Sequence, residues 1–230
     1  MGTAVLALGL SLAAAPAPAA KPGFLVTWSE GRVEVSGDRG QTWRPLARGD
    51  RVDPRGQVRT GEAARVELVG GDGSRVRVGA LGHLEIDRAA SAPGRRTIGL
   101  RLWAGRLWAR VTKAQGPRSS FEVRTAHAIA GVRGTAFAVV ARADLSAVVR
   151  VYTGSVGVRG ADSGGNARHS RKRVAGPQRV TRAQWEEVVA TAMTEVRISA
   201  AGEIRPAESF EDEGGSLLWA EWNQARDAKP

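Results

Sequence analysis

Residues 129–140 read "IAGVRGTAFAVV", and this stretch decides the predicted fold. The apolar residues at its two ends are typical of a β-strand, but Gly131, Arg133 and Gly134 interrupt it. Glycine permits a backbone conformation, or a close approach of another segment, that a side chain would block. The pattern therefore favours a bulge or corner that fixes the sheet. The alternative is an Arg133 side chain that is presented to a partner.

Outward from this stretch, residues 24–158 alternate apolar and polar side chains with a period of two. The alternation is clearest at residues 33–35, 66–68, 76–78, 98–102 and 149–151. Turn sequences rich in Gly, Asp and Pro separate these runs. About ten or more short strands at this spacing predict an all-β domain, built as a sandwich, a barrel or a β-solenoid.

Two short patterns recur along the predicted strands. The triplet Val-Arg-Thr occurs at residues 58–60 and again at 123–125, which points to a duplicated unit. A glycine followed two positions later by Val or Leu occurs at Gly31, Gly105 and Gly154. Each of these glycines is predicted to mark a strand that enters the same sheet after a turn. Chance recurrence in a β-protein is the alternative for both patterns.

Residues 1–20 differ in composition from the rest of the chain. Apolar and small residues run from Thr3 to Ala15, and the small-residue pattern Ala17-Pro18-Ala19 follows. This order is typical of a secretory signal peptide, and the run is shorter than the roughly 20 residues of a membrane-spanning helix. We therefore expect export to the bacterial periplasm or beyond, with no transmembrane span in the mature chain. A weak, uncleaved anchor is the alternative.

Composition narrows the range of partners. Cysteine is absent, which excludes disulfides, thiolate chemistry and cysteine-ligated zinc. The net charge is +11, although residues 200–230 carry seven acidic side chains against three basic ones. A basic chain favours anionic partners, and outside the cytoplasm these are head groups, acidic glycans and cell-wall polymers. Nucleic acid is therefore not the expected partner.

Three further segments follow the predicted β-domain of residues 24–159. Residues 160–180 are a predicted linker, with a candidate anion-binding patch or a solvated loop at Arg168, Arg171, Lys172 and Arg173. Within residues 181–230, the apolar positions from Trp185 to Val196 predict an amphipathic helix that packs on the domain or binds a partner. In the acidic tail, Trp219 and Trp222 predict a short helix that docks both indoles on the domain. If they do not dock, they form a binding surface.

No catalytic arrangement is recognisable in the sequence. His83, His127 and His169 lie in unrelated contexts, and the Gly-x-Ser-x-Gly, His-Glu-x-x-His and phosphate-loop motifs are missing. We expect no enzymatic activity, no cofactor, no metal and no small-molecule substrate. The remaining enzymatic alternative is a glycan-active enzyme, whose two carboxylates come from distant strands.

The strands on both sides of the opening stretch resemble the FecR domain family over residues 26–159. The matching elements are Phe121–Thr125, Val132–Phe137, the closing Gly154–Val156 and, upstream, residues 58–78 with their Asp-Gly-Ser turn. The motif residues are Gly131, Val132, Arg133, Gly134, Thr135 and Phe137. The resemblance implies an all-β envelope domain without catalysis. The family's namesake, FecR, looks like a sigma-factor regulator that spans the inner membrane. In this chain residues 1–20 resemble a cleavable signal instead, so we do not expect it to regulate a sigma factor.

We therefore predict a FecR-like β-sandwich or β-solenoid-like domain with a C-terminal amphipathic helix and a short tail. Its predicted role is that of a non-enzymatic binding or scaffolding module in the cell envelope. The expected partner is an envelope protein or an anionic polymer of the cell wall or outer membrane. A basic nucleic-acid-binding protein is the alternative, and it requires that residues 1–20 are not a signal.

Overall fold

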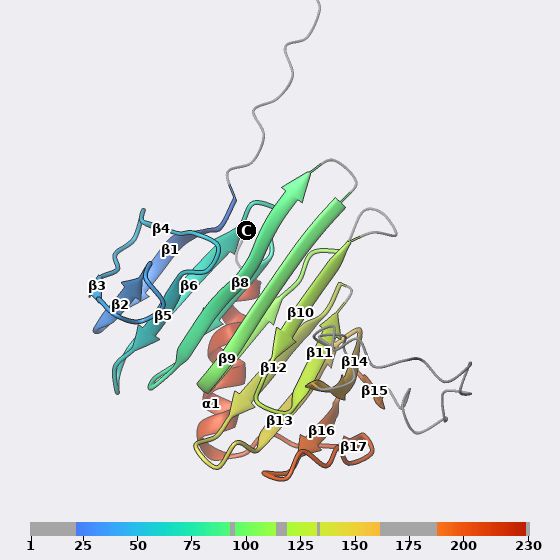
Figure 1. Cartoon of the computed structure of the whole chain (residues 1–230). Helices are drawn as coiled ribbons and strands as arrows, with labels where there is room; N and C mark the ends of the chain where they lie inside the picture. The colour runs from blue at the N-terminus through green and yellow to red at the C-terminus, as the bar shows by residue number, and fades with distance from the viewer. Residues whose placement is uncertain (1–21, 93–94, 114–118, 133, 162–187, 229–230) are drawn as a thin grey trace, which may run out of the picture.

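The computed structural model describes residues 22–92, 95–113, 119–132, 134–161 and 188–228. These residues form two β-sheets and one α-helix, stacked as three layers (Figure 1). The predicted all-β fold is confirmed, and it takes the form of a sandwich. The predicted signal peptide and nearly all of the predicted linker lie outside the described residues.

Sheet A has the strand order β4–β1–β6–β7–β9–β12–β13–β16–β17, and all of its neighbouring strands are antiparallel. Its strands are β1 (Phe24–Glu30), β4 (Arg51–Val52), β6 (Arg65–Gly70), β7 (Arg75–Val78), β9 (Arg95–Arg110), β12 (Ala136–Ala141), β13 (Ala147–Thr153), β16 (Thr194–Ile198) and β17 (Glu208–Ser209).

Sheet B has the order β3–β2–β5–β8–β9–β10–β11–β14–β15, in which β9 and β10 are the parallel pair. Its further strands are β2 (Val33–Ser36), β3 (Arg44–Pro45), β5 (Gln57–Thr60), β8 (His83–Ala92), β10 (Ser120–Arg124), β11 (Ala128–Val132), β14 (Ser155–Gly160) and β15 (Val188–Thr191).

Strand β9 belongs to both sheets. Residues 95–104 pair with β8 and β10 in sheet B, and residues 105–110 pair with β7 and β12 in sheet A. Gly105 stands at the change with φ +87°, and a Cβ there would lie 2.6 Å from the Cα of Gly82. Gly31 and Gly154 also have positive φ, and each stands where the chain passes from sheet A to sheet B. The expectation that these glycines lead into the same sheet is therefore wrong, because Gly31 and Gly154 lead into sheet B and Gly105 into sheet A. The pattern marks crossings between the sheets, where the backbone needs glycine.

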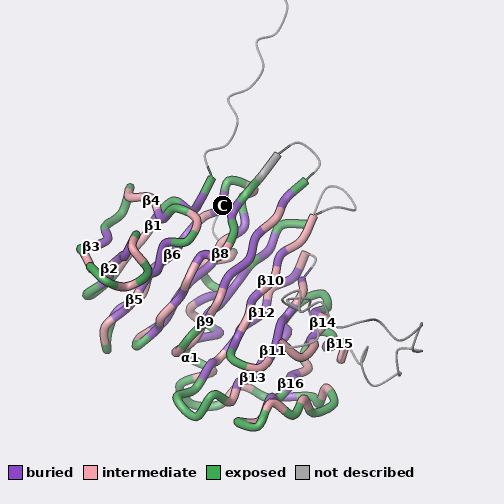
Figure 2. Tube along the Cα trace, in the orientation of Figure 1, coloured by how far each residue is buried: buried purple, intermediate pink, exposed green. Residues whose placement is uncertain are grey.

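The hydrophobic core fills the space between the two sheets. Alternate side chains point into it from each strand, for example Leu100 and Leu102 of β9 and Val149 and Val151 of β13. Figure 2 shows the buried positions alternating with more exposed ones along the strands. Burying each such side chain contributes about 1.5–3 kcal/mol, which explains why period two in the sequence predicted the fold.

The structure supports the predicted duplication. Both Val-Arg-Thr triplets begin in sheet B, the first in β5 and the second in β10. Each is followed by a hairpin in sheet A, β6–β7 and β12–β13, and the two hairpins flank β9 on opposite sides. Strand β11 is an addition of the second half.

The predicted helix over residues 185–196 is wrong from Val188 onward, where β15 and β16 replace it. The apolar residues fit a period of two as well, since Ala190 and Val196 reach the core from different sheets. Valine and threonine favour strands, and Met193, with φ +60°, forms the turn between the two. The β-domain therefore continues past residue 159, while residues 181–187 lie outside the described part.

Helix α1 (Gly214–Asp227) covers the outer face of sheet A and lies behind the strands in Figure 1. Trp219 is buried and stacks on Trp222, with 5.4 Å between the ring centroids, and Trp222 contacts Trp28 of β1. The short helix expected around the two tryptophans is thus present and docked. Within the described residues, no helix combines the length and the apolar character that crossing a membrane requires.

Candidate functional site

The motif of residues 131–137 forms a corner between the two sheets. Strand β11 ends in sheet B at Val132 and β12 begins in sheet A at Ala136, so the chain crosses between these two strands. Gly134 has φ +71°, and a Cβ there would lie 3.2 Å from the Cα of Lys113. At Gly131 the nearest atom to an added Cβ is the Gly157 carbonyl oxygen at 3.8 Å, so a side chain would fit. The corner therefore needs the second glycine of the motif but not the first.

Thr135 holds this corner in place through a backbone hydrogen bond and through close packing of its methyl group. Its backbone carbonyl accepts a hydrogen bond from the Val111 N–H at 2.8 Å, and a Cβ on Gly154 would lie 2.5 Å from its methyl group. Its hydroxyl is buried and has no hydrogen-bond partner among the described residues. Val132 and Phe137 pack in the core. Arg133 lies outside the described residues, so its presentation to a partner stays a prediction.

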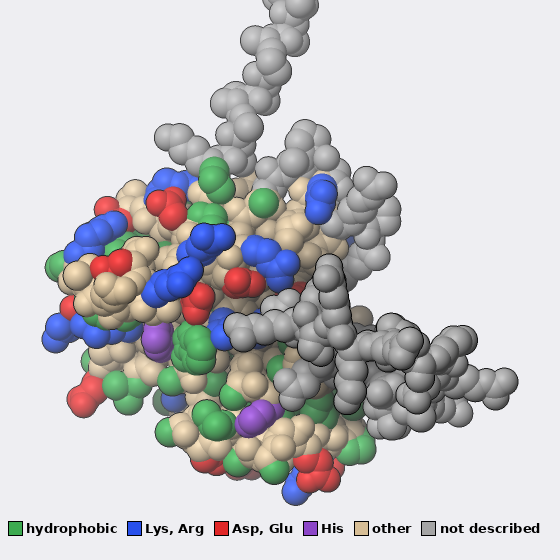
Figure 3. Space-filling model, viewed as in Figure 1, with side chains coloured by type: hydrophobic (Ala, Val, Ile, Leu, Met, Phe, Trp, Pro, Cys, Tyr) green, Lys and Arg blue, Asp and Glu red, His purple; other side chains and the backbone are tan. Residues whose placement is uncertain are grey.

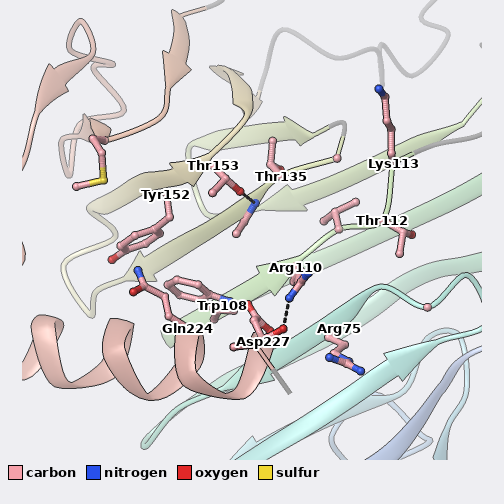
Figure 4. A pocket seen from close by; sticks show the side chains of 16 residues that line it. Arg75, Trp108, Arg110, Thr112, Lys113, Thr135, Tyr152, Thr153, Gln224 and Asp227 are labelled. Atoms are coloured by element: carbon pink, nitrogen blue, oxygen red, sulfur yellow. Dashed lines mark hydrogen bonds between the residues drawn. The ribbon is translucent and has the colours of Figure 1, made fainter. Parts of the chain in front are cut away.

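A groove of about 1070 Å³ lies beside the corner, on the outer face of sheet A (Figure 4). The corner, from Gly134 to Ala136, forms one side of it. The last turn of α1 forms the other side, with Gln224 and Asp227. Three basic side chains, Arg75, Arg110 and Lys113, also line it. The groove thus joins the family motif to the C-terminal helix.

The sheet beneath α1 carries a row of cross-strand neighbours that we call the covered row. It consists of Glu67, Arg77, Trp108, Ala138, Arg150 and Glu195. Arg77 is fully buried, and its Nε donates a 2.6 Å hydrogen bond to Glu67 Oε2. Its Nη1 lies 2.8 Å from Asp227 Oδ1 and donates to the Asn223 carbonyl oxygen at 3.2 Å. A buried guanidinium is thereby matched by one carboxylate from the sheet and one from α1.

The partners of Glu67 keep this carboxylate ionised. Burial by itself would raise the pKa of Glu67, but hydrogen bonds from Thr27 and Arg77 and the charges of Arg77 and Arg226 outweigh it and lower the pKa. The indole Nε1 of Trp108 donates to Asp227 Oδ2 at 2.9 Å. The network therefore anchors the last turn of α1 through charge as well as through packing.

A second ion-pair group of the covered row holds the segment before α1. Arg150 Nε donates to Glu195 Oε2 at 2.7 Å, and its Nη1 donates to Asp212 Oδ1 at 2.9 Å. The Tyr152 hydroxyl donates to the same Asp212 oxygen at 3.1 Å. Burial and this hydrogen bond raise the pKa of Tyr152, so the phenol stays neutral and acts as a donor.

The open row lies beyond the end of α1, two residues further along β6, β7, β9 and β12 and, because of a bulge, three residues further along β13. It consists of Val69, Arg75, Arg110, Ala136 and Thr153. Arg75 and Arg110 are direct cross-strand partners. Arg110 Nη1 donates to the backbone carbonyl oxygen of Asp227. The side chain of Arg75 has no hydrogen bond or ion pair with a described residue. The described structure thus leaves two neighbouring cations in the groove without a carboxylate of their own.

The outer face of sheet B differs from the open row of sheet A, because its basic side chains lie among acidic ones. Figure 3 shows basic side chains over β8 and β9 with acidic ones between them. Arg59 pairs with Glu34 at 2.7 Å. Arg101 lies over the ring of Trp103, which is 46% exposed. Charge on this face is largely compensated within the face itself.

The sequence located the motif and the docked tryptophans but missed the groove between them. Arg75 and Arg110 lie far apart in sequence, and only the pairing of β7 with β9 makes them neighbours. The one available signal was the run Arg75-Val-Arg77, which places two arginines on one strand face. The candidate patch Arg168, Arg171, Lys172 and Arg173 lies outside the described residues. Among the residues that the structure places, no three potential metal ligands cluster.

Comparison with known proteins identifies the domain. The family model of the FecR protein matches residues 56–157, from β5 to β14, which include the corner and the central strands of both rows. Two crystal structures of a candidate anti-sigma factor from Parabacteroides distasonis are similar in fold. Each has a TM-score of 0.50 and 18% identity over 73% of this chain, and the match spans 64% of the other chain, less than two thirds of its length. No curated protein matches in sequence.

The FecR match confirms the resemblance that the motif residues carry. Such a domain indicates a regulatory or signalling module, and the likeness to the crystal structures concerns the fold. The FecR family model therefore accounts for residues 56–157 of this chain.

Proposed function

We propose that this FecR-domain protein is a non-enzymatic recognition module of the bacterial envelope. In this proposal it binds an envelope protein or an anionic envelope polymer through the groove beside the motif corner. The observation that carries the proposal is the groove itself, where the family motif, the last turn of α1 and three basic side chains meet. A regulatory or signalling role for the FecR domain is in keeping with such a site.

The side chains around the groove favour binding over catalysis. Asp227 is the one carboxylate among its lining residues, and Arg77 and Trp108 already engage that carboxylate. A glycan-active enzyme would need two facing carboxylates about 5–10 Å apart across its cleft. Glu67 and Glu195 lie beneath α1 or the segment before it, where they pair with arginines. Their role is therefore to hold the C-terminal segment on the sheet.

Export is part of the proposal, and the signal-like residues 1–20 support it. The test is crosslinking of the tagged full-length protein in cells, with mass spectrometry of the captured partners and of the N-terminus of the protein. We expect an N-terminus near Ala20 and attached envelope proteins or cell-wall fragments. A variant with charge reversal at Arg75 alone is the control, because this groove cation makes no described hydrogen bond or ion pair with the covered row or with α1.

The opposite outcome is equally specific. An intact Met1 with nucleic acid attached would refute the envelope proposal and make the net charge of +11 the main functional feature. Steep salt dependence of DNA binding by the purified protein would then identify the nucleic-acid alternative.

A further inference from the structure

We propose that Arg75 and Arg110 form a binding site for the carboxylates of an acidic peptide segment in a partner protein. This inference rests on the proposed recognition role of the groove and names the chemistry of its ligand. The two arginines face each other across β7 and β9 on the open row. Like charges directly opposite each other on a sheet destabilise it, and arginine cannot relieve this repulsion by losing its proton. A bound carboxylate would relieve it.

The covered row shows how the same sheet face neutralises an arginine. Arg77 lies on the same strand and the same face as Arg75, two residues along. There the charge is matched by Asp227, which α1 brings from a distant part of the chain, and by Glu67. The groove begins where α1 ends, at Ala228. An acidic segment bound in line with α1 would place carboxylates beside Arg75 and Arg110, as Asp227 places one beside Arg77.

The lining of the groove favours a peptide over a glycan or a nucleic acid. Sugars and bases bind by stacking on exposed aromatic rings. Trp108 is fully buried and Tyr152 is only 9% exposed, so neither offers a free ring face. Apart from the basic side chains and Gln224, the open parts of the lining are aliphatic or hydroxylic, with the half-exposed Met193 and the hydroxyl of Thr153. Apolar side chains interspersed with carboxylates complement this surface.

The test begins with selection of random peptides displayed on phage against the full-length protein. The selected peptides are then synthesised, and their affinity is measured by fluorescence anisotropy. We expect the selected peptides to be enriched in Asp and Glu. We expect Arg75→Gln, Arg110→Gln and replacement of the peptide acids by their amides each to weaken binding at least about tenfold. Combining a protein change with a peptide change is expected to cost less than the sum of the two effects.

The matched control is Arg101→Gln, which removes the same charge from the outer face of sheet B, where Arg101 lies over Trp103. It is expected to leave peptide affinity unchanged. Arg75→Gln is also expected to melt at the same temperature as the unmodified protein or higher, because it removes a repulsion. Lost binding by a folded variant would then identify the groove.

Three results would overturn the inference. They are selected peptides without acidic enrichment, affinity that is indifferent to Arg75→Gln and Arg110→Gln, and displacement of the peptides by oligogalacturonate or an oligothymidylate at equal charge. Each result is separable from failure of the proposed function. If crosslinking still captures envelope partners with the Arg75→Gln variant, recognition stands and the carboxylate site is wrong.

Discussion

The covered row and the open row are neighbours on one face of sheet A, yet they treat arginine in opposite ways. Arg77 is fully buried, donates hydrogen bonds to Glu67 and Asn223, and forms an ion pair with Asp227. Arg75, two residues along, faces Arg110 with no acidic partner among the described residues. Both positions lie within the FecR domain. The difference arises from α1, which ends between the two rows.

This contrast separates stability from recognition. A buried charge without a counter-charge costs several kcal/mol, so the fold supplies carboxylates wherever its own helix excludes water. An arginine in an open groove keeps its hydration and costs little in the free protein, so it is available for a ligand. The covered row therefore stabilises the molecule, and the open row is the expected binding site for a partner.

The largest expected effect is that of Arg77→Ala. Removing the guanidinium leaves Asp227 without its cation and Glu67 with only the more distant Arg226, at 3.7 Å, and loosens the last turn of α1. We expect the free energy of unfolding in urea to fall by about 3–5 kcal/mol. A loss below about 1 kcal/mol would mean that the covered row is not an anchor and that the contrast with Arg75 is false.

A second test compares the indole that α1 buries with the most exposed indole on sheet B. Trp219→Ala removes a buried ring that stacks on Trp222, and we expect a loss of about 3 kcal/mol. Trp103→Ala removes a half-exposed ring, and we expect about 1 kcal/mol or less. Thermal or urea unfolding measures both. Equal losses would contradict the view that α1 is a structural layer.

Acid should weaken the ion pairs of the covered row. The folded-state pKa of Glu67 is below its ordinary value of 4.5, so its contribution to stability is complete above that pH. The contribution is lost as the pH falls from the ordinary pKa through the lower folded-state pKa. Unfolding curves at a series of pH values are expected to show this decline, and Glu67→Gln should have a shallower one. An unchanged slope would show that other carboxylates, such as Glu195, dominate acid unfolding.

The smallest expected effect on stability is that of Arg75→Gln. Because the change removes a like-charge pair and breaks no described hydrogen bond, the free energy of unfolding should stay within about 0.5 kcal/mol or rise. Added salt should reduce any gain, since it screens the repulsion that the substitution removes. A clear destabilisation would indicate that Arg75 is a structural residue and would weaken the case for the groove.

The elements that the sequence predicted well are those with local causes. Alternation of apolar residues predicted the strands, and the glycines at 31, 105 and 154 predicted changes of direction, which proved to be crossings between sheets. The corner at Gly134 was expected for the same local reason. The spacing of Trp219 and Trp222 predicted a short helix. The false helix over residues 185–196 has a local cause too, because its apolar residues satisfy both periods and only sheet pairing decides between them.

The amino-acid sequence by itself determined the all-β character, the FecR motif and the positions of the glycine corners, since each depends on neighbouring residues and their conformational preferences. Only the tertiary structure decided which face α1 covers, that Arg77 meets Asp227, and that Arg75 meets Arg110. These contacts join segments from separate strands and from the C-terminal helix, and their energies depend on burial and counter-charge. Local sequence patterns do not determine burial or the position of counter-charges. The groove could therefore be recognised only from the tertiary structure.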